Sequence, residues 1–424
     1  MSGLLGSLQS ARTGMSASQA SIQTTSHNIN NLNTPGYSRQ QVEQKARSAY
    51  SYPGYNSQLG AGQLGTGVEV TDIVRVRNSF YDFQFRNESH TYGQIGVKYD
   101  HYSTMETIFN EPSETGISSS INNFFMSWQE LSKNPNDVGS KDIVIQNSDY
   151  LAKNISNVYK KLNELSENAK KKLNENIDDI NGKLKELKEL DKQIKLVEGS
   201  GKSPNDLMDE RDRILDDLSF KMNINDENVQ KLLKDKIASG ENITEDDLKK
   251  IPGVSGEIKG SFEMLDKIEG YKKDLEELAE GIKKSVNDTL GVDIFETGTD
   301  SILKVKDDIL DKTTDLNITA DTAQKMYKLK DEKVSIGGED ITIDNFYNSI
   351  IQRLGNETQE VRRNEKNQSK VLKEIDSSRL NVSGVSLDEE MINLIQFQHA
   401  YNASAKVVST IDSLLDVVIN GLVR

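Results

Sequence analysis

Residues 387–422 read LDEEMINLIQFQHAYNASAKVVSTIDSLLDVVINGL, and apolar side chains recur along them at intervals of seven residues. A strict seven-residue repeat keeps one apolar seam turned toward a partner helix, which is the pattern of a coiled coil. The repeat therefore predicts a long C-terminal helix that packs against another helix. The seam positions are Leu387, Leu394, Phe397, Tyr401, Val408, Ile411, Leu415, Val418 and Leu422.

A similar repeat lies at the opposite end of the chain, within residues 3–32. Thr34-Pro35-Gly36 should end that helix, because proline lacks a backbone donor and disfavours helix in the residue before it. The net charge is +3 over residues 1–60 and −3 over residues 380–424, which modestly favours pairing of the two ends. We predict that the terminal helices pack together and form a seam for assembly with neighbouring copies. The N-terminal seam positions are Leu4, Leu8, Met15, Ile22, Ile29 and Leu32.

The residues between the two ends are predicted to be mainly helical. Helix caps are expected at Ser203, at Asp344, and at Ser386 with Glu389 as a capping box. Residues 37–66 lack periodicity and are expected to be extended or locally ordered. Short strands are expected around Val68–Ile73 and in a hairpin formed by 334–336 and 341–343. The expected helices span about 76–110, 117–131, 138–198, 257–290 and 345–379, and a further helix starts at Ser203 and carries residues 209–215.

This pattern predicts a mainly α fold with a terminal-helix coiled-coil domain and an elongated helical-bundle domain that has a few short strands. The first domain comprises 1–60, including an extended linker, together with 380–424. The second domain comprises 61–222 and 257–379. The polar stretch 223–256, with short helical pieces, is expected to be a small variable excursion rather than an independent domain.

The composition argues for a structural protein. The chain has 424 residues, 35% hydrophobic and 28% charged, a net charge of −15 and no cysteine. No basic face suits nucleic acid, and no stretch is apolar enough to span a bilayer. The four histidines lack zinc-binding spacing, and no catalytic motif organises the serines and acids, so we expect no catalytic, cofactor or metal site. Asp209-Glu210-Arg211-Asp212 is interpreted as an exposed helix face above an apolar stripe of Leu207, Ile214, Leu215 and Leu218.

Local motifs add a family resemblance. Asn28 to Gln40, which reads NINNLNTPGYSRQ, resembles the N-terminal signature of bacterial flagellar axial proteins. Its continuation, Tyr37-Ser38-Arg39-Gln40, and the stretch Ser383–Met391 resemble the hook-associated protein 1 (FlgK) family. The resemblance covers roughly 1–220 and 257–424 in the same order. The turn residues concerned are Asn33, Thr34, Pro35, Gly36, Tyr37, Ser38, Arg39 and Gln40.

This resemblance implies a structural subunit that joins the flagellar hook to the filament. In that family the terminal helices line the inner tube and the second domain lies outside it. The β-rich outer domain usual in such proteins is expected to be reduced or absent here. Implied partners are other copies of the chain, the hook protein, the next hook-associated junction protein, and the flagellar export chaperone and export apparatus. The implied location is the extracellular flagellum, reached through the flagellar secretion channel without a cleaved signal peptide.

Two alternatives remain from the sequence. The first is a hook or distal-rod subunit, which would share the terminal motifs. The second is an adhesin or peptidoglycan-processing enzyme attached to flagellar ends, although the chain has no evident room or catalytic residues for it.

Overall fold

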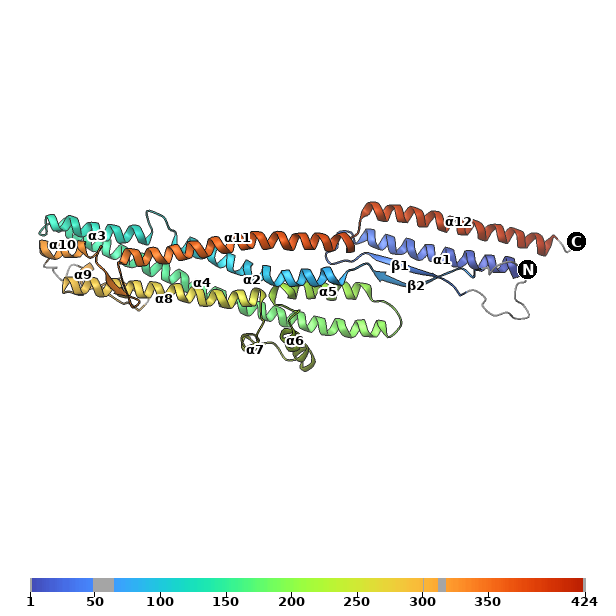
Figure 1. Ribbon diagram of the computed structural model, residues 1–424, viewed down its shortest axis with the longest axis horizontal. Helices are drawn as coiled ribbons and strands as arrows, with labels where there is room; N and C mark the ends of the chain where they lie inside the picture. Colours follow the sequence, from blue (N-terminus) through green and yellow to red (C-terminus); the bar gives the residue numbers. More distant parts are fainter. Residues whose placement is uncertain (1, 49–64, 300, 312–317, 422–424) are drawn as a thin grey trace.

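The protein, represented by a computed structural model, is elongated, and both chain ends lie at the same end of it (Figure 1). The structure describes residues 2–48, 65–299, 301–311 and 318–421. Helix α1 (Ser2–Asn30) runs beside the antiparallel helix α12 (Leu387–Asn420). The two-stranded ribbon β1 (Gln40–Ala46) and β2 (Val68–Arg75) packs against α1. This group of four elements is called the terminal unit below.

A bundle of long helices forms the rest of the molecule. It contains α2 (Ser79–Phe109), α3 (Ile117–Lys133), α4 (Val138–Glu198), α5 (Asn205–Lys221), α8 (Gly256–Leu290) and α11 (Ile343–Ser383). Each helix turns an apolar stripe inward, as an amphipathic helix in a bundle must. The largest fully buried side chains include Trp128, Tyr271, Tyr347 and Phe124. The core is therefore a thin column that follows the long axis of the bundle.

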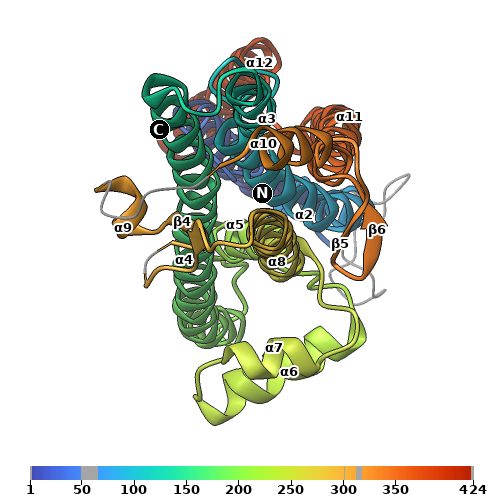
Figure 2. The ribbon, with the colours of Figure 1, turned by 90° about the vertical axis from the view of Figure 1, so that its left-hand side faces the viewer.

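A second, smaller core lies under α6 (Glu227–Ser239) and α7 (Glu245–Lys250), which sit at the periphery of the bundle in Figure 2. Val229, Leu233 and Leu248 of these helices pack with side chains of α4, α5 and α8. The buried Asn181 amide on α4 accepts from the Ile243 N–H at 2.7 Å and donates to its carbonyl oxygen at 3.0 Å. Residues 223–256 thus share their core with the bundle.

The far end of the bundle contains the remaining short elements. They are β3 (Phe295–Glu296), β4 (Lys304–Val305), α9 (Asp307–Leu310), α10 (Ala320–Lys328), β5 (Val334–Ile336) and β6 (Glu339–Ile341). Across the described ranges, strands occur in three two-stranded antiparallel sheets and in no larger sheet. The prediction of a mainly α fold with a few short strands and no extensive β domain is confirmed.

Several local predictions need correction. Ser203 does not cap α5, because its hydroxyl donates to Asp72 instead. Thr342, two residues before the predicted Asp344, caps α11 by accepting from the Asn345 N–H. The side chain of Ser386 precedes α12 without forming the predicted capping box with Glu389.

The strands also differ from the prediction. The second strand of the hairpin is Glu339–Ile341 rather than 341–343, because Gly337 and Gly338, both with positive φ, make a tight two-residue turn. Part of the segment predicted to be extended or locally ordered is the strand β1, which pairs with β2 with a register shift between Glu43 and Gln44. The remainder, 49–64, lies outside the described residues.

Two glycines three residues apart on α2 give a matched test of the packing between α2 and α5. A Cβ at Gly93 would lie 2.2 Å from the Phe220 carbonyl oxygen, whereas a Cβ at Gly96 meets nothing within 4 Å. We expect Gly93→Ala to lower the free energy of unfolding by about 2 kcal/mol, since backbone must move. Gly96→Ala should raise it by about 0.5–1 kcal/mol. Urea denaturation of both variants checks this, and a stabilised Gly93→Ala chain would refute the close approach.

Candidate functional site: the neck between the terminal unit and the bundle

The neck is where the terminal unit joins the bundle. It comprises the turn Asn33–Gln40, the segment Arg75–Arg86, helix α5 and the end of α11 from Asp376 to Gly384. Gly36, with φ +83°, lets the turn reverse, and a Cβ there would lie 3.4 Å from the Arg213 side chain on α5. The motif identified in the sequence therefore lies where the terminal unit meets the bundle.

Asn28, near the end of α1, organises the first layer of the neck. Its Nδ2 donates to the Gln40 carbonyl oxygen at 2.9 Å and to Glu390 Oε2 at 3.0 Å. Its Oδ1 accepts from the Tyr37 hydroxyl at 2.7 Å and from the Gln40 N–H at 2.9 Å. All the bonds that an amide side chain can make are thus formed, although Asn28 is buried.

The next residues of the turn attach to three helices. Ser38 is buried, and both its N–H and its hydroxyl donate to Asp209 on α5, at 2.9 and 2.7 Å. The Arg39 N–H donates to the Ser383 carbonyl oxygen at 2.8 Å, and its guanidinium pairs with Glu389 on α12 at 3.0 Å. Gln40 donates from its side chain to Asp206 at 2.8 Å. The turn therefore couples α5, the end of α11 and the start of α12.

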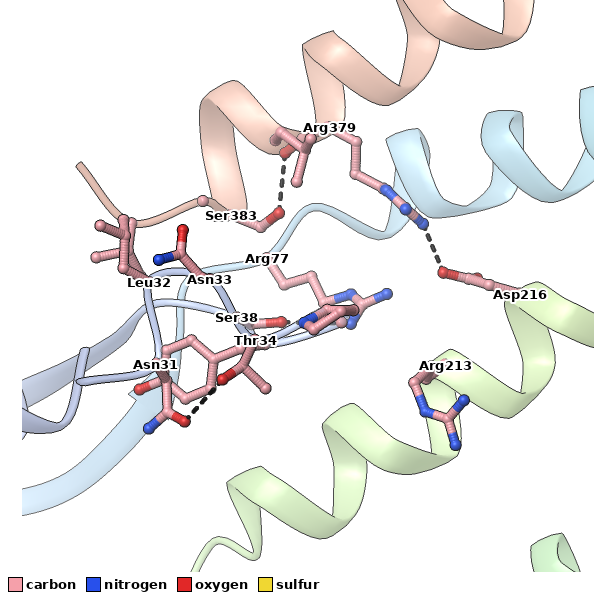
Figure 3. Close-up of a pocket in the computed structure, with 16 residues that line it drawn as sticks. Asn31, Leu32, Asn33, Thr34, Ser38, Arg77, Arg213, Asp216, Arg379 and Ser383 are labelled. Carbon is pink, nitrogen blue, oxygen red and sulfur yellow. Dashed lines mark hydrogen bonds and ion pairs between the residues drawn. The ribbon is translucent and has the colours of Figure 1, made fainter. Parts of the chain in front are cut away.

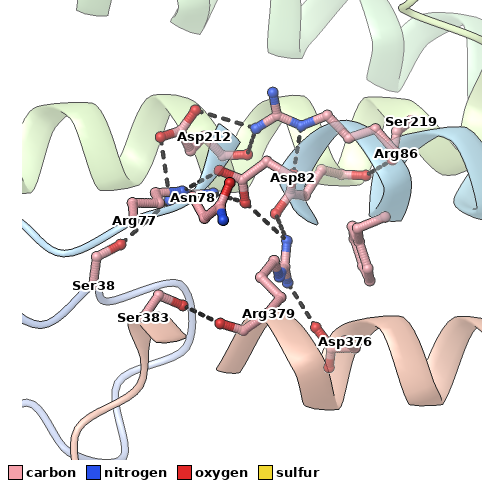
Figure 4. Close-up of polar contacts among 12 residues, drawn as sticks. Ser38, Arg77, Asn78, Asp82, Arg86, Asp212, Ser219, Asp376, Arg379 and Ser383 are labelled. Atoms are coloured by element: carbon pink, nitrogen blue, oxygen red, sulfur yellow. Dashed lines mark hydrogen bonds and ion pairs between the residues drawn. The ribbon is translucent and has the colours of Figure 1, made fainter. Parts of the chain in front are cut away.

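A largely buried ionic cluster forms the second layer of the neck (Figure 4). It joins four arginines, from β2, the β2–α2 connection, α2 and α11, to aspartates of α2 and α5. The side chains are between 8% and 17% exposed. The closest pairs are Arg75 with Asp209 and Asp212, both at 2.8 Å, Arg77 with Asp82 at 2.7 Å, Arg86 with Asp216 at 2.7 Å, and Arg379 with Asp216 at 2.6 Å.

Arg379 brings α11 into this cluster. Its guanidinium lies 3.9 Å from the centre of the Phe85 ring and also pairs with Asp376 at 2.8 Å. The planar guanidinium suits both contacts, because it stacks on an aromatic face while its edge binds carboxylates. The end of α11 is therefore fixed against α2 and α5 just before the chain enters α12.

Asp212 lies among three arginines, at 2.8 Å from Arg75 and 3.1 Å from Arg77 and Arg86. Burial opposes its ionisation, but Arg77, Arg75 and Arg86 outweigh this effect and hold the pKa of Asp212 below its usual value of 3.8. A carboxylate whose folded pKa is lowered contributes stability above the pKa of the unfolded chain, and loses that contribution as the pH falls through the folded pKa.

This shift predicts a pH dependence for the neck. The difference in unfolding free energy between the parent chain and Asp212→Asn should be largest and constant above about pH 5. It should shrink as the pH falls below the ordinary aspartate pKa of 3.8. Urea denaturation of both chains between pH 3 and pH 7 measures the difference. A constant difference over that range would contradict the assigned role of Asp212.

A cleft of ≈ 250 Å³ opens beside these layers (Figure 3). Leu32, Pro35, Leu380 and Val385 contribute its apolar lining, and Arg77, Arg213 and Arg379 contribute charge. These arginines are already paired with carboxylates of the neck. Within the described residues, no group of three or more histidines and acids has the arrangement of a metal site. The same residues contain no helix long and apolar enough to cross a bilayer.

The predicted C-terminal seam residues are distributed unequally in the structure. Ile411 is buried at 5% exposure, and the side chain of Leu387 is 46% exposed. Leu422 lies outside the described residues. The other seam positions, Leu394, Phe397, Tyr401, Val408, Leu415 and Val418, are partly buried.

The N-terminal helix buries a different face from the predicted apolar stripe. Its most buried residues are the small or polar Ala17, Ser21, Thr24 and Asn28, together with Ser18 and Thr25. Leu4, Leu8, Met15, Ile22 and Ile29 are only partly buried, and Leu32 is 37% exposed. The buried face of α1 is therefore made of small and polar side chains, and much of the apolar surface of α1 is left partly uncovered.

The sequence did not reveal the ionic cluster, and the interpretation of Asp209–Asp212 as an exposed face was wrong for Asp209 and Asp212, whose side chains are 8% and 14% exposed. Asp209 is buried, and its carboxylate serves Ser38 and Arg75. The apolar stripe beneath is only partly as expected, since Ile214 and Leu218 are buried and Leu207 and Leu215 partly so. The four arginines of the cluster could not be recognised from the sequence. They lie in distant segments and come together only after folding, so their spacing shows no pattern.

Three family models match the chain. Residues 102–231 match the flagellar hook-associated protein FlgK helical domain. Residues 8–37 match the flagella basal body rod protein family, and 376–421 match the C-terminal family of flagellar basal body rod FlgEFG proteins. Two rod-type terminal helices joined through a neck to a helical bundle define a flagellar axial structural protein.

Comparison with whole proteins narrows this class. Flagellar hook-associated protein 1 of Bacillus subtilis is 31% identical, with 98% of each chain covered. Its counterpart in Salmonella typhimurium is 29% identical over 49% of this chain and 37% of its own. The chain belongs to the flagellar hook-associated protein 1 family, which is a structural and not an enzymatic family.

A solved structure described as the flagellar hook junction protein FlgK from Burkholderia pseudomallei is also similar. The TM-score is 0.41 at 15% identity, over 51% of this chain and 47% of the other. As a member of the flagellar hook-associated protein 1 family, the chain is a hook-associated structural component of the flagellum.

Proposed function

We propose that this protein forms the junction between the flagellar hook and the filament, and that it assembles through its terminal helices. The observation that carries the proposal is the uncovered apolar surface of α12. Met391, Ile392, Ile395, Val407, Leu414 and Val417 are between 40% and 70% exposed. Monomeric proteins seldom leave such an apolar surface uncovered, and contiguous patches of this kind mark interaction sites.

The geometry supports a second copy as the occupant of this surface. One face of α12 is already occupied by α1, and the partly buried Leu8, Met15, Ile22 and Ile29 lie along the same end of the molecule. Repetition of one subunit around a closed or helical arrangement would bury both sets. The neck would transmit the position of the packed terminal helices to the bundle outside.

The remaining parts of the proposal follow from the family. We propose the terminal domain 1–60 with 380–424 as the inner-tube part, and 61–222 with 257–379 as the outer part, with 223–256 as a reduced insertion. The proposed neighbours are the hook protein and the next hook-associated protein. The chain would reach them by flagellar export, assisted by a chaperone and without a cleaved signal.

Electron microscopy of a strain that lacks the gene tests this function. Loss of a junction subunit should leave hooks intact and remove the filaments, and the parent gene should restore them. Cells without hooks would instead support the alternative role as a hook or distal-rod subunit, which the rod-type matches at both ends also allow.

A further inference from the structure

We propose that Asn28 and Glu390 form a register lock, which selects one alignment of α1 against α12 from several that the seam alone would accept. Glu390 is 3% exposed, and Asn28 is 1% exposed. Their side chains meet at 3.0 Å, joining residues 362 positions apart in the chain. No other charged or amide side chain of the described parts of α1 and α12 is buried.

A second contact fixes the register away from the lock. A Cβ at Gly14 would lie 3.4 Å from the Ser404 hydroxyl. Gly14 is fourteen residues before Asn28, and Ser404 is fourteen residues after Glu390, so one antiparallel alignment accounts for both contacts. Counting from Asn28 through Gly14 in steps of seven adds Ser21 and Ser7 to the same heptad row of α1.

This face of α1 discriminates poorly between registers. The row has small residues at Ser7, Gly14 and Ser21, so α12 displaced by seven residues would again meet small side chains there. The pair Asn28–Glu390 breaks this degeneracy. A shift of seven residues would place Asn28 opposite Phe397 or Ser383, and the buried carboxylate would lose its partner.

The Asn28 side chain is also fixed in one orientation, which a contact that selects one register requires. Tyr37 and Gln40 occupy the remaining bonding capacity of Asn28, so its amide cannot rotate toward another acceptor. In coiled coils, a single buried polar pair of this kind specifies register at some cost in stability. The register in turn determines how far along α1 the uncovered apolar positions of α12 lie.

Disulfide crosslinking tests the lock, because the chain contains no cysteine of its own. One full-length chain carries Gly14→Cys with Ser404→Cys, and a second carries Ser7→Cys with Ser404→Cys. The second pair is one heptad out of register, or about 10 Å along the helix, beyond the roughly 7 Å Cα separation that a disulfide tolerates. Mild oxidation of dilute protein should therefore crosslink the first pair within one chain and leave the second open.

The same two pairs are then placed in Glu390→Leu and, as the matched control, in Glu390→Gln. Glutamine keeps an oxygen that accepts from Asn28, so selectivity for the 14–404 pair should persist. Leucine removes the acceptor, and the two pairs should crosslink to comparable yields with helix content unchanged by circular dichroism. Two outcomes in Glu390→Leu overturn the proposal. The first is undiminished selectivity for the 14–404 pair, which would mean that the connection 384–386 alone sets the register. The second is loss of both crosslinks.

Discussion

Replacing Arg379 by alanine is expected to lower the free energy of unfolding by about 3 kcal/mol. Arg379 is 17% exposed, pairs with Asp216 at 2.6 Å and covers the Phe85 ring. Its removal leaves the largely buried Asp216 carboxylate with fewer partners and uncovers an aromatic ring. Both losses fall at the neck, so the end of α11 should also loosen from α2 and α5.

Arg362 provides the matched control on the same helix. It pairs with Glu106 at 3.2 Å, but its side chain is 56% exposed. Exposed ion pairs are screened by solvent, and Arg362→Ala should cost less than about 1 kcal/mol. Urea denaturation of the two variants measures the difference. Equal losses would show that the neck cluster contributes no more than an ordinary surface pair.

Introducing two aspartates on the uncovered apolar face of α12 is expected to abolish filament growth. Leu414 is 48% exposed and Val417 is 65% exposed in the single chain, so Leu414→Asp with Val417→Asp should leave its folding largely intact. In an assembly, the same positions would bury two unpaired charges. That costs several kcal/mol, and about 1.4 kcal/mol already weakens association tenfold.

The matched control replaces the same residues by apolar ones, Leu414→Met with Val417→Ile. These changes keep the surface apolar, and filaments should form at close to the parent number. Secretion of both variants into the medium verifies that export is unaffected. Parent-like filaments on the double aspartate variant would show that this face does not lie in a subunit contact.

The sequence was sufficient for features that depend on local periodicity. The bounds of α4 agree with its prediction at 138–198, since its apolar positions recur regularly over the whole helix. The terminal repeat likewise predicted α12. Caps were less predictable, because the candidate hydroxyls and carboxylates had other partners in the folded chain. Ser203 binds Asp72, and Glu389 binds Arg39.

Only one part of the neck, its turn, could be predicted from the sequence, because the partners of the turn lie far away along the chain. Its turn was recognised through a contiguous motif, Asn33–Gln40. Among the residues that bind this turn, Asp206, Asp209, Ser383 and Glu389 lie at least 166 positions further along the chain. Pairing over such distances leaves no spacing rule in one sequence. Residues 295–328, where β3, β4, α9 and α10 lie, were missed because these elements are too short to show periodicity.

A reconstruction of the native hook–filament junction, at a resolution that shows side chains, tests the central claim most directly. The account predicts α1 and α12 on the inside of the tube and the bundle outside. It also predicts that Leu414 and Val417 of each copy are buried against terminal helices of neighbouring copies. A junction without this chain, or one in which that face of α12 is turned toward solvent, would contradict it.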